Sequence, residues 1–202
     1  MGEIGKRTFD FVAAIGGIVV LSPLFVLIGV AIRIDTPGQI IFRQTRVGRH
    51  GCRFEIMKFR TMCEGAEALG RETLGTKDPR ITQVGSMLRR SKLDELPQLF
   101  NVVRGDMSLV GPRPEIPYYA DRYAKEDQVI LSVRPGITDP SSLALADLDS
   151  IMASRGSESA ADFYARVVQP QKLLLQRSYV EGRSFPGDLW IILRTLGRIV
   201  WK

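Results

Sequence analysis

The chain is 202 residues long, which is enough for one domain with a buried core. Its 28 basic and 22 acidic residues give a formal net charge of +6, which favours an anionic partner such as a nucleic acid, lipid headgroups or a phosphorylated substrate. Cys52, Cys63 and His50 are its only cysteines and histidine, so the composition excludes a structural zinc site and predicts reduced thiols, as in the cytosol.

An uncharged apolar run covers residues 11–32. As a helix, about 22 residues extend roughly 33 Å, enough to cross a hydrocarbon core of about 30 Å. Ser22 and Pro23 stand in the middle of the run, where a proline removes one backbone hydrogen bond and bends the helix.

Basic residues flank this run at both ends, namely Lys6 and Arg7 before it and Arg33, Arg43, Arg46 and Arg49 after it. Lysine and arginine mark the cytoplasmic side of a membrane, so both ends are expected there. We therefore predict that residues 1–35 form a re-entrant, helix-break-helix membrane segment. A spanning helix, a signal peptide and a buried core helix are the alternatives.

Two short segments with alternating apolar residues follow, at 39–44 and 54–60, and Gly48 and Gly51 lie between them. Alternation bounded by glycine is typical of paired β-strands. We predict a small β-hairpin.

Two adjacent carboxylates, Asp94 and Glu95, lie between a predicted helix at 84–90 and a second helix that has Pro97 in its first turn and Gly105 at its end. The positive N-terminal end of a helix stabilises a carboxylate, and an ionised aspartate there is a competent nucleophile. The alternative is that Asp94 only caps the helix.

Cationic side chains accompany this pair on nearby turns and loops. They are Lys58, Arg60, Arg80, Arg89, Arg113 and Arg134. The segments 111–114 and 134–138 are predicted to be rigid loops because they combine glycine and proline. Phosphoryl transfer needs cations to neutralise phosphate oxygens, and a carboxylate can accept the transferred group. The absence of P-loop and GxGxxG motifs disfavours P-loop, kinase and dehydrogenase functions.

The C-terminal segment, about 186–202, has the pattern of an amphipathic helix with basic residues on one face and Trp190 among its apolar residues. Such a helix can lie at a membrane interface, and docking against the core is the alternative. Asp147 and Asp149 form a DxD pattern that can hold a divalent metal, but three residues match easily by chance, so we interpret them as a solvated turn or helix face.

The order of several motifs resembles that of the bacterial sugar transferases, the small monotopic phosphoglycosyl transferases. The similar stretches are KFRTM at 58–62, DPRIT at 78–82, LRRSKLDELPQLFNVVRGDMSLVGPRP at 88–114 and VRPGIT at 133–138, together with the Ser22-Pro23 bend. The chain departs from the common pattern at Lys92, where many members have serine. It departs again at 139–142, where Asp-Pro-Ser-Ser replaces a Gly-Leu-Ala-Gln run, and no role is carried over beyond Asp139.

The resemblance implies transfer of a sugar-1-phosphate from a UDP-sugar to a polyprenyl (undecaprenyl) phosphate with release of UMP, the first membrane step of glycoconjugate or polysaccharide assembly. Asp94 would form an aspartyl-phosphosugar intermediate, and Glu95 would help bind the Mg²⁺ that the family needs and deprotonate the acceptor. The implied phosphate- and nucleotide-binding residues are Lys58, Arg60, Arg89, Gly111, Pro112, Arg113 and Arg134. Ser22 and Pro23 would set the membrane bend.

We therefore predict a mixed α/β, mostly helical monotopic membrane protein with a re-entrant N-terminal helix, a small β-hairpin and interfacial amphipathic helices. Residues 1–35 would form one unit with a cytoplasmic catalytic domain at 36–202, on the cytoplasmic face of the bacterial inner membrane. The expected partners are the UDP-sugar, polyprenyl phosphate and an anionic phospholipid bilayer, and not nucleic acid. Two rival hypotheses are a basic, membrane-anchored binding module, and a glycosyltransferase that uses Asp147 and Asp149 for its metal.

Overall fold

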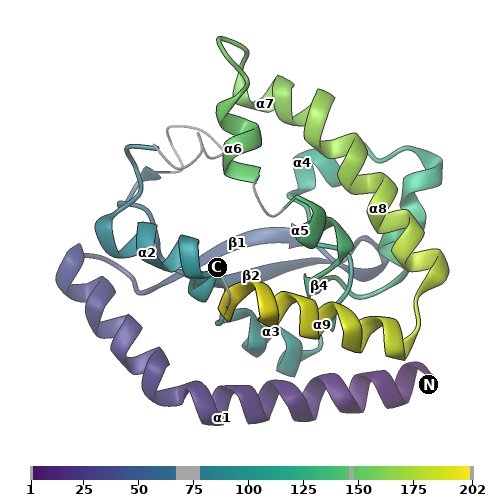
Figure 1. Cartoon of the computed structure of the whole chain (residues 1–202), viewed down its shortest axis with the longest axis horizontal. Helices are drawn as coiled ribbons and strands as arrows, with labels where there is room; N and C mark the ends of the chain where they lie inside the picture. The colour runs from purple at the N-terminus through teal and green to yellow at the C-terminus, as the bar shows by residue number, and fades with distance from the viewer. Residues whose placement is uncertain (1, 67–77, 146–147, 201–202) are drawn as a thin grey trace.

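The computed structural model describes residues 2–66, 78–145 and 148–200. The described fold is mostly helical, with two small two-stranded sheets and a long N-terminal helix, α1 (Glu3–Asp35), that runs along one edge of the molecule (Figure 1). The other elements are β1 (Ile41–Val47), η1 (Arg49–Gly51), β2 (Arg53–Phe59), α2 (Gln83–Ser91), η3 (Leu93–Glu95), α3 (Gln98–Arg104), β3 (Ser108–Val110), α4 (Pro117–Ala120), η4 (Lys125–Ser132), β4 (Gly136–Thr138), α5 (Pro140–Ala144), α6 (Leu148–Ala153), α7 (Ala160–Phe163), the π-helical segment η5 (Tyr164–Val168), α8 (Gln169–Gly182) and α9 (Phe185–Val200).

α1 is one continuous helix of 33 residues that bends partway along its length (Figure 1). Pro23 lies inside it and has no N–H to donate to the carbonyl of Val19, four residues earlier. The Ser22 hydroxyl donates to that same carbonyl at 2.8 Å, so the acceptor keeps a partner. The predicted helix-break-helix is therefore corrected to a bent but unbroken helix.

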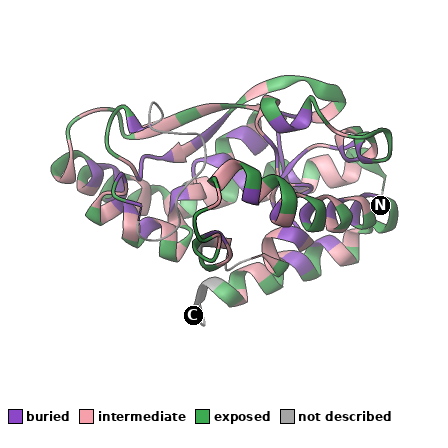
Figure 2. Cartoon of the chain, turned by 90° about the horizontal axis from the view of Figure 1, so that it is seen from above, coloured by how far each residue is buried: buried purple, intermediate pink, exposed green. Residues whose placement is uncertain are grey.

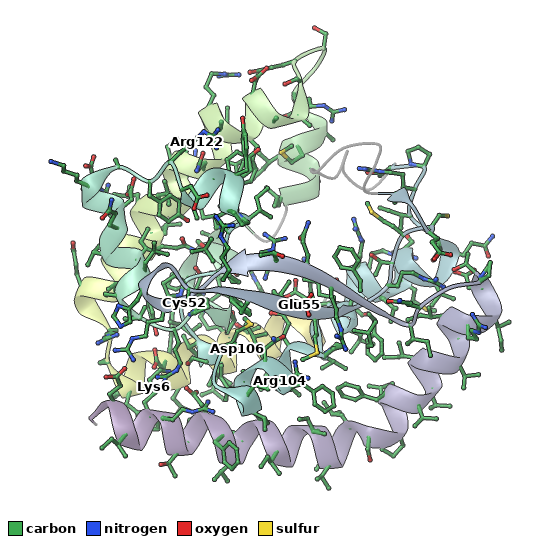
Figure 3. The ribbon with its side chains drawn as sticks, turned by 180° about the vertical axis from the view of Figure 1, so that it is seen from behind. Lys6, Cys52, Glu55, Arg104, Asp106 and Arg122 are labelled. Atoms are coloured by element: carbon green, nitrogen blue, oxygen red, sulfur yellow. The ribbon has the colours of Figure 1, made fainter. Side chains whose placement is uncertain are left out.

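The two sides of α1 differ in their surroundings. One side is exposed and carries large apolar residues, namely Ile4, Phe11, Val12, Ile15, Val19, Val20, Val26, Leu27, Val30 and Ile34. Figure 3 shows side chains along the outer edge of α1 projecting away from the rest of the molecule. Among the described residues, α1 is the one helix that is long and apolar enough to cross a membrane.

The inner side of α1 contributes to the core. Ala14 packs in a buried cluster with Ile56 of β2 and Val102 of α3. Ile28 and Ile32 belong to a second cluster, with residues of β2 and α2. Figure 2 shows the buried residues gathered toward the middle of the molecule, with exposed residues along the outer faces of the helices. The apolar N-terminal helix is therefore packed into the same core as the hairpin and α3.

The sequence predicted one of the two sheets and missed the other. β1 and β2 pair in antiparallel fashion, with Ile41 opposite Phe59, which confirms the predicted hairpin. β3 and β4 form a parallel pair, so the prediction that 134–138 is only a rigid loop is wrong for Gly136–Thr138. A strand of three residues is too short to show alternation, and its pairing depends on a residue far along the chain.

One side of α9 packs against the core, and its other side is exposed. Ile191 is buried in the core, and the Thr195 and Thr138 hydroxyls lie 2.8 Å apart, so one side of the helix is docked. The other side exposes Leu189, Trp190, Leu193 and Leu196. The Arg194 guanidinium lies 4.5 Å from the centre of the Trp190 ring. Such a face has the composition of a helix at a membrane interface.

Candidate active site

Asp94 and Glu95 lie in the short turn η3, between α2 and α3. The chain enters this turn through Lys92, which ends α2 in a left-handed conformation with φ of 59°. Leu93 and Leu96 pack against the core cluster that contains the second half of α1. The turn is thus anchored by a leucine on each side of the carboxylate pair.

Glu95 holds two cations from different parts of the chain. Lys58 of β2 donates to Oε1 at 2.9 Å, and Arg113 donates to Oε2 at 3.1 Å through Nη1 and to Oε1 through Nη2. Burial alone would raise the pKa of Glu95, but the Arg113 guanidinium and the Lys58 ammonium hold that pKa well below its ordinary value. Glu95 is therefore an ionised anchor for two positive side chains.

Asp94 has a different environment. It is only 8% exposed, and its carboxylate accepts no hydrogen bond from the part of the chain that the structure describes. The amides at the start of α3 receive no side-chain cap, so Asp94 does not act as the helix cap that the sequence left open. Burial raises the pKa of Asp94, while the charge of Lys58 opposes that rise.

The same surroundings also shift the pKa values of Lys58 and Arg113. Burial lowers the pKa of Lys58, although Glu95 works in the opposite direction. Glu95 raises the pKa of Arg113, so this guanidinium is positive at neutral pH. The site therefore contains one unpaired carboxylate beside two cations held by a second carboxylate, an arrangement suited to binding phosphate.

Arg113 belongs to the loop that follows β3, where Gly111 and Pro112 act through their backbone. A Cβ on Gly111 would lie 2.4 Å from the carbonyl oxygen of Arg134, so this close approach requires glycine. The Pro112 carbonyl accepts a hydrogen bond from the amide of Gly136 at 3.1 Å. These contacts fix the loop against β4, and they place Gly111 and Pro112 as supports of Arg113.

Two of the predicted phosphate-binding arginines, Arg60 and Arg89, donate hydrogen bonds to groups other than the carboxylate pair. Arg60 donates to the carbonyls of Thr36 and Pro37 at 2.7 and 2.6 Å, in the loop that follows α1. Arg89 donates to the Thr61 hydroxyl at 2.9 Å, but its charge still lies near enough to lower the pKa of Asp94, after the larger effects of burial, Lys58, Glu95 and Lys92.

Arg134 lies at a separate place. Its Nε donates to the Gly105 carbonyl at 3.0 Å, and it lines a cleft of about 130 Å³ beside the N-terminal end of α1. In the same cleft Lys6 donates to Asp188 of α9 at 2.6 Å, and Figure 3 shows Lys6 between α1 and the C-terminal helix. The structure therefore brings Lys58 and Arg113, but not Arg60 or Arg134, into contact with the carboxylate pair.

α1 is also attached to α3, the helix that follows the pair. Arg7 donates to the Val102 and Val103 carbonyls at 2.6 and 3.0 Å, at the C-terminal end of α3. Asp10 accepts from the Ser108 hydroxyl at 2.8 Å. Hydrogen bonds thereby join α1 to α3, which follows the turn that carries Asp94, and to the start of β3.

Some residues near the site were not recognised from sequence. Asn101 of α3 accepts from the Met57 amide at 2.9 Å and donates to the Glu55 carbonyl at 2.7 Å, so it fixes β2, and with it Lys58, against α3. Asp139 and Gln176 contact the backbone of Arg113. Asn101 lies in a motif that carried the resemblance, but its amide does not titrate and so was not considered a candidate site residue. Gln176 was missed because it lies 63 positions after Arg113 in the sequence.

The carboxylate pair is the candidate for a metal site. Mg²⁺ prefers carboxylate oxygens together with phosphate oxygens and water. The described residues contain no cluster of three or more His, Cys, Asp and Glu side chains, so this pair fits Mg²⁺ only when substrate oxygens complete the shell. Asp147 of the alternative DxD pattern lies outside the described residues, as does the side chain of Asp149.

Comparisons with known proteins identify the family of the chain. The model of the bacterial sugar transferase family matches residues 1–202. The UDP-N-acetylgalactosamine–undecaprenyl-phosphate N-acetylgalactosaminephosphotransferase of Aeromonas hydrophila is 43% identical over 136 residues, which are 66% of this chain and 32% of that protein. The UDP-glucose:undecaprenyl-phosphate glucose-1-phosphate transferase of Caulobacter vibrioides is 37% identical over 199 residues, which are 96% of this chain and 69% of that protein.

A third relative, the undecaprenyl-phosphate glucose phosphotransferase of Komagataeibacter xylinus, is 37% identical over 205 residues, which are 98% of this chain and 36% of that protein. The chain thus spans about a third of two of these relatives and about two thirds of the other. The family model covers the whole chain, including the motifs between residues 58 and 138 that carried the resemblance. The chain belongs to the bacterial sugar transferase family and is a transferase enzyme.

Proposed function

We propose that this enzyme transfers a sugar-1-phosphate from a UDP-sugar to undecaprenyl phosphate through a covalent intermediate on Asp94, with release of UMP. The observation that carries the proposal is the contrast within one turn, where Asp94 is unpaired while Glu95 holds Lys58 and Arg113 beside it. The names of the Aeromonas and Caulobacter relatives, which state a UDP-sugar donor and an undecaprenyl-phosphate acceptor, support the choice of substrates.

In the first step, a carboxylate oxygen of Asp94 attacks the phosphorus that carries the sugar. A bond forms between this oxygen and the phosphorus, the bond from the phosphorus to the bridging oxygen breaks, and UMP leaves with the electron pair. Lys58 and Arg113 neutralise charge on the phosphate oxygens, which is the main contribution that a protein makes to phosphoryl transfer. The unpaired Asp94 carboxylate has its lone pairs available for attack.

In the second step, an oxygen of undecaprenyl phosphate attacks the same phosphorus and Asp94 leaves as a carboxylate. The product is undecaprenyl diphosphate sugar. A phosphate monoester is largely ionised at neutral pH, so this step needs no proton removal. Glu95, with its depressed pKa, is a weak base, and we assign it the role of holding Lys58 and Arg113 rather than deprotonating the acceptor.

Glu95, which contacts Lys58 and Arg113, would help to hold Mg²⁺, and the metal would supply further neutralisation of phosphate charge. Asp94 has no hydrogen-bond partner among the described residues and keeps its oxygens for the attack. The protein itself presents the nucleophile, Asp94, and orients the cations, Lys58 and Arg113.

For the membrane, we propose that α1 enters one leaflet and returns, so that the active site lies at the cytoplasmic face of the bacterial inner membrane. Basic residues at both flanks of α1 and the bend near its middle support this topology. The exposed apolar face of α9 would lie in the headgroup layer, where Trp190 is suited to the interface, and the net charge of +6 favours an anionic phospholipid bilayer. A lipid phosphate acceptor stays in that layer, so the nucleophile must be held at the same depth.

The catalytic proposal is tested with purified protein in lipid nanodiscs, a panel of UDP-sugars, undecaprenyl phosphate and Mg²⁺. We expect UMP as the nucleotide product; UDP would instead support a glycosyltransferase. With the donor alone, the intact mass of the wild type should rise by one sugar phosphate. Asp94→Asn should show neither turnover nor adduct, while Asp121→Asn, at an exposed carboxylate paired with Arg53, should behave as the wild type. Turnover by Asp94→Asn would reject the nucleophile assignment.

The topology is tested with tags at the two ends of the chain in intact cells. Both tags should be protected from reagents added outside, because both ends of α1 are expected on the cytoplasmic side. Labelling of the N-terminal tag alone would establish a spanning helix.

A further inference from the structure

The backbone of Arg113 is held on both sides by the same pair of side chains. Its amide donates to Asp139 Oδ2 at 3.3 Å, and its carbonyl accepts from Gln176 Nε2 at 3.2 Å. Gln176 Nε2 also donates to Asp139 Oδ2 at 3.0 Å. The three residues therefore form a closed ring of hydrogen bonds, from which the side chain of Arg113 extends to Glu95.

The two partners of Arg113 are completely inaccessible to solvent. Asp139 and Gln176 are each 0% exposed. Burying a carboxylate and an amide is unfavourable unless their hydrogen bonds are made. Both hydrogen bonds of Gln176 Nε2 are to Asp139 and Arg113, whereas Gln176 Oε1 is buried without a partner in the described part of the protein. A polar cluster placed at such a cost in desolvation fixes geometry more firmly than apolar packing, because each bond has a direction.

The two carboxylate oxygens of Asp139 accept hydrogen bonds from different groups. Oδ1 accepts from the Ser142 amide at 2.7 Å and thereby caps the first turn of α5. Oδ2 accepts from Arg113 and Gln176, and also from the Ser141 hydroxyl at 2.7 Å. The cap needs only one oxygen, so capping does not explain the contact to Arg113. This residue opens the segment 139–142 in which the chain departs from the common family pattern.

α8 supplies a second tie to the same loop. Lys172 lies one turn before Gln176 on the buried face of the helix and donates to Glu115, two residues after Arg113. Glu115 also accepts from the Tyr164 hydroxyl at 2.5 Å. The loop that carries Arg113 is therefore bound to α8 at two points, the carbonyl of Arg113 and the carboxylate of Glu115.

We propose that Asp139 and Gln176 are positioning residues, which hold the backbone of Arg113 so that its guanidinium stays in place beside Glu95 and the transferred phosphate. The inference rests on the proposed function for the role of Arg113 in phosphate binding. An arginine side chain has many rotamers, and a displacement of about 1 Å in a catalytic group can reduce the rate by about 100-fold. Fixing the backbone reduces the range of positions that the guanidinium can reach.

The experiment is a double-mutant cycle on UMP release. Asp139→Ser keeps a side chain that can cap α5 but is too short to reach Arg113, and Gln176→Met keeps the volume without the donor. Each should lower kcat/KM by about tenfold, with the KM for the UDP-sugar raised. In an Arg113→Lys background the same substitutions should change kcat/KM by less than about twofold, because the group that they position has been replaced.

The control is Ser159→Ala, which removes the cap of α7, where the Ser159 hydroxyl accepts from the Asp162 amide at 3.1 Å. It should lower stability and leave kcat/KM unchanged. Equal losses of activity from Asp139→Ser in the wild-type and Arg113→Lys backgrounds would show a merely structural role and overturn the inference. An unchanged kcat/KM in both single variants would do the same. Neither result affects the proposed function, whose own test is the adduct on Asp94.

Discussion

Asp94 and Glu95 are consecutive residues with opposite surroundings, since Glu95 binds Lys58 and Arg113 whereas Asp94 accepts no hydrogen bond from the described chain. Burial raises the pKa of Asp94, and the two cations outweigh burial and lower that of Glu95. When the pKa values of two acids in one site are moved apart, the two acids have different roles. We therefore expect substitutions of the two residues to have different effects on stability, activity and pH dependence.

Glu95→Gln should lower both stability and activity. The substitution leaves the Lys58 and Arg113 charges largely buried without their acid, and loss of one partner from such a pair costs about 3 kcal/mol in the free energy of unfolding, less where water reaches the pair. Turnover should fall by about 100-fold as the cations lose their positions. Chemical denaturation and UMP release measure the two effects.

The control for this prediction lies on the same strand as Lys58. Glu55 pairs with Arg43 at 3.8 Å, with both side chains more than half exposed. Glu55→Gln should therefore change the free energy of unfolding by no more than about 0.5 kcal/mol. A loss of stability in Glu55→Gln as large as that in Glu95→Gln would contradict the assignment of Glu95 as an internal anchor.

The fall of kcat/KM at low pH, the acid limb of the pH profile, should reflect protonation of Asp94. Burial moves its pKa above the ordinary value of 3.8, and the nucleophile must be ionised, so kcat/KM should fall as the pH decreases through that raised pKa. The Lys58 charge lowers the pKa of Asp94, so Lys58→Met should move the acid limb to higher pH. Lys125→Met, at an exposed position, should leave the limb in place. A shift to lower pH in Lys58→Met would contradict the electrostatic account.

Replacing Ser22 with alanine and Pro23 with leucine should alter the bend of α1. Leucine restores an N–H that can donate to the Val19 carbonyl, so the helix should straighten. We expect the N-terminal tag to become accessible from outside, with a loss of transfer. Ser22→Ala alone leaves that carbonyl without a donor, and should lower stability by about 1 kcal/mol while keeping the topology. If the double variant keeps both topology and rate, the bend depends on other residues.

Gln98→Met tests a buried amide in the first turn of α3. Gln98 is 0% exposed, and neither atom of its amide has a hydrogen-bond partner in the described part of the protein. Methionine has a similar volume and no polar group to desolvate, so the free energy of unfolding should rise, by about 1 kcal/mol. Denaturation midpoints measure this change. A clear fall in stability would show that the amide is satisfied by water in solution.

Sequence patterns predicted the elements whose residues are close in the chain. Alternating apolar residues predicted the hairpin, and helical periodicity predicted α2. A glycine predicted the end of α3, where Gly105 has a φ of 96°. The family pattern also singled out Asp94, Glu95, Lys58 and Arg113, and the structure brings these four side chains into one site.

Features that depend on distant residues could not be predicted in the same way. Arg60 was predicted to bind phosphate because it lies in the KFRTM motif at 58–62, but its guanidinium donates to carbonyls of the loop that follows α1. The parallel pairing of β3 with β4 needs Gly111 and Gly136 to face each other, which no local pattern indicates. The contact of Gln176 with Arg113 joins residues 63 positions apart. Such long-range contacts decide the details of the site.

The packing of α1 has a consequence for the position of the carboxylate pair. α1 precedes every other described element in the chain, and it supplies Ala14, Ile28 and Ile32 to the interior against which the Asp94 turn and α3 pack. Its outer surface favours lipid over water. The turn that carries Asp94 therefore depends on α1 for part of its packing, because Leu93 and Leu96 lie against the cluster that contains Ile28 and Ile32. A displacement of α1 from this cluster would also move the carboxylate pair.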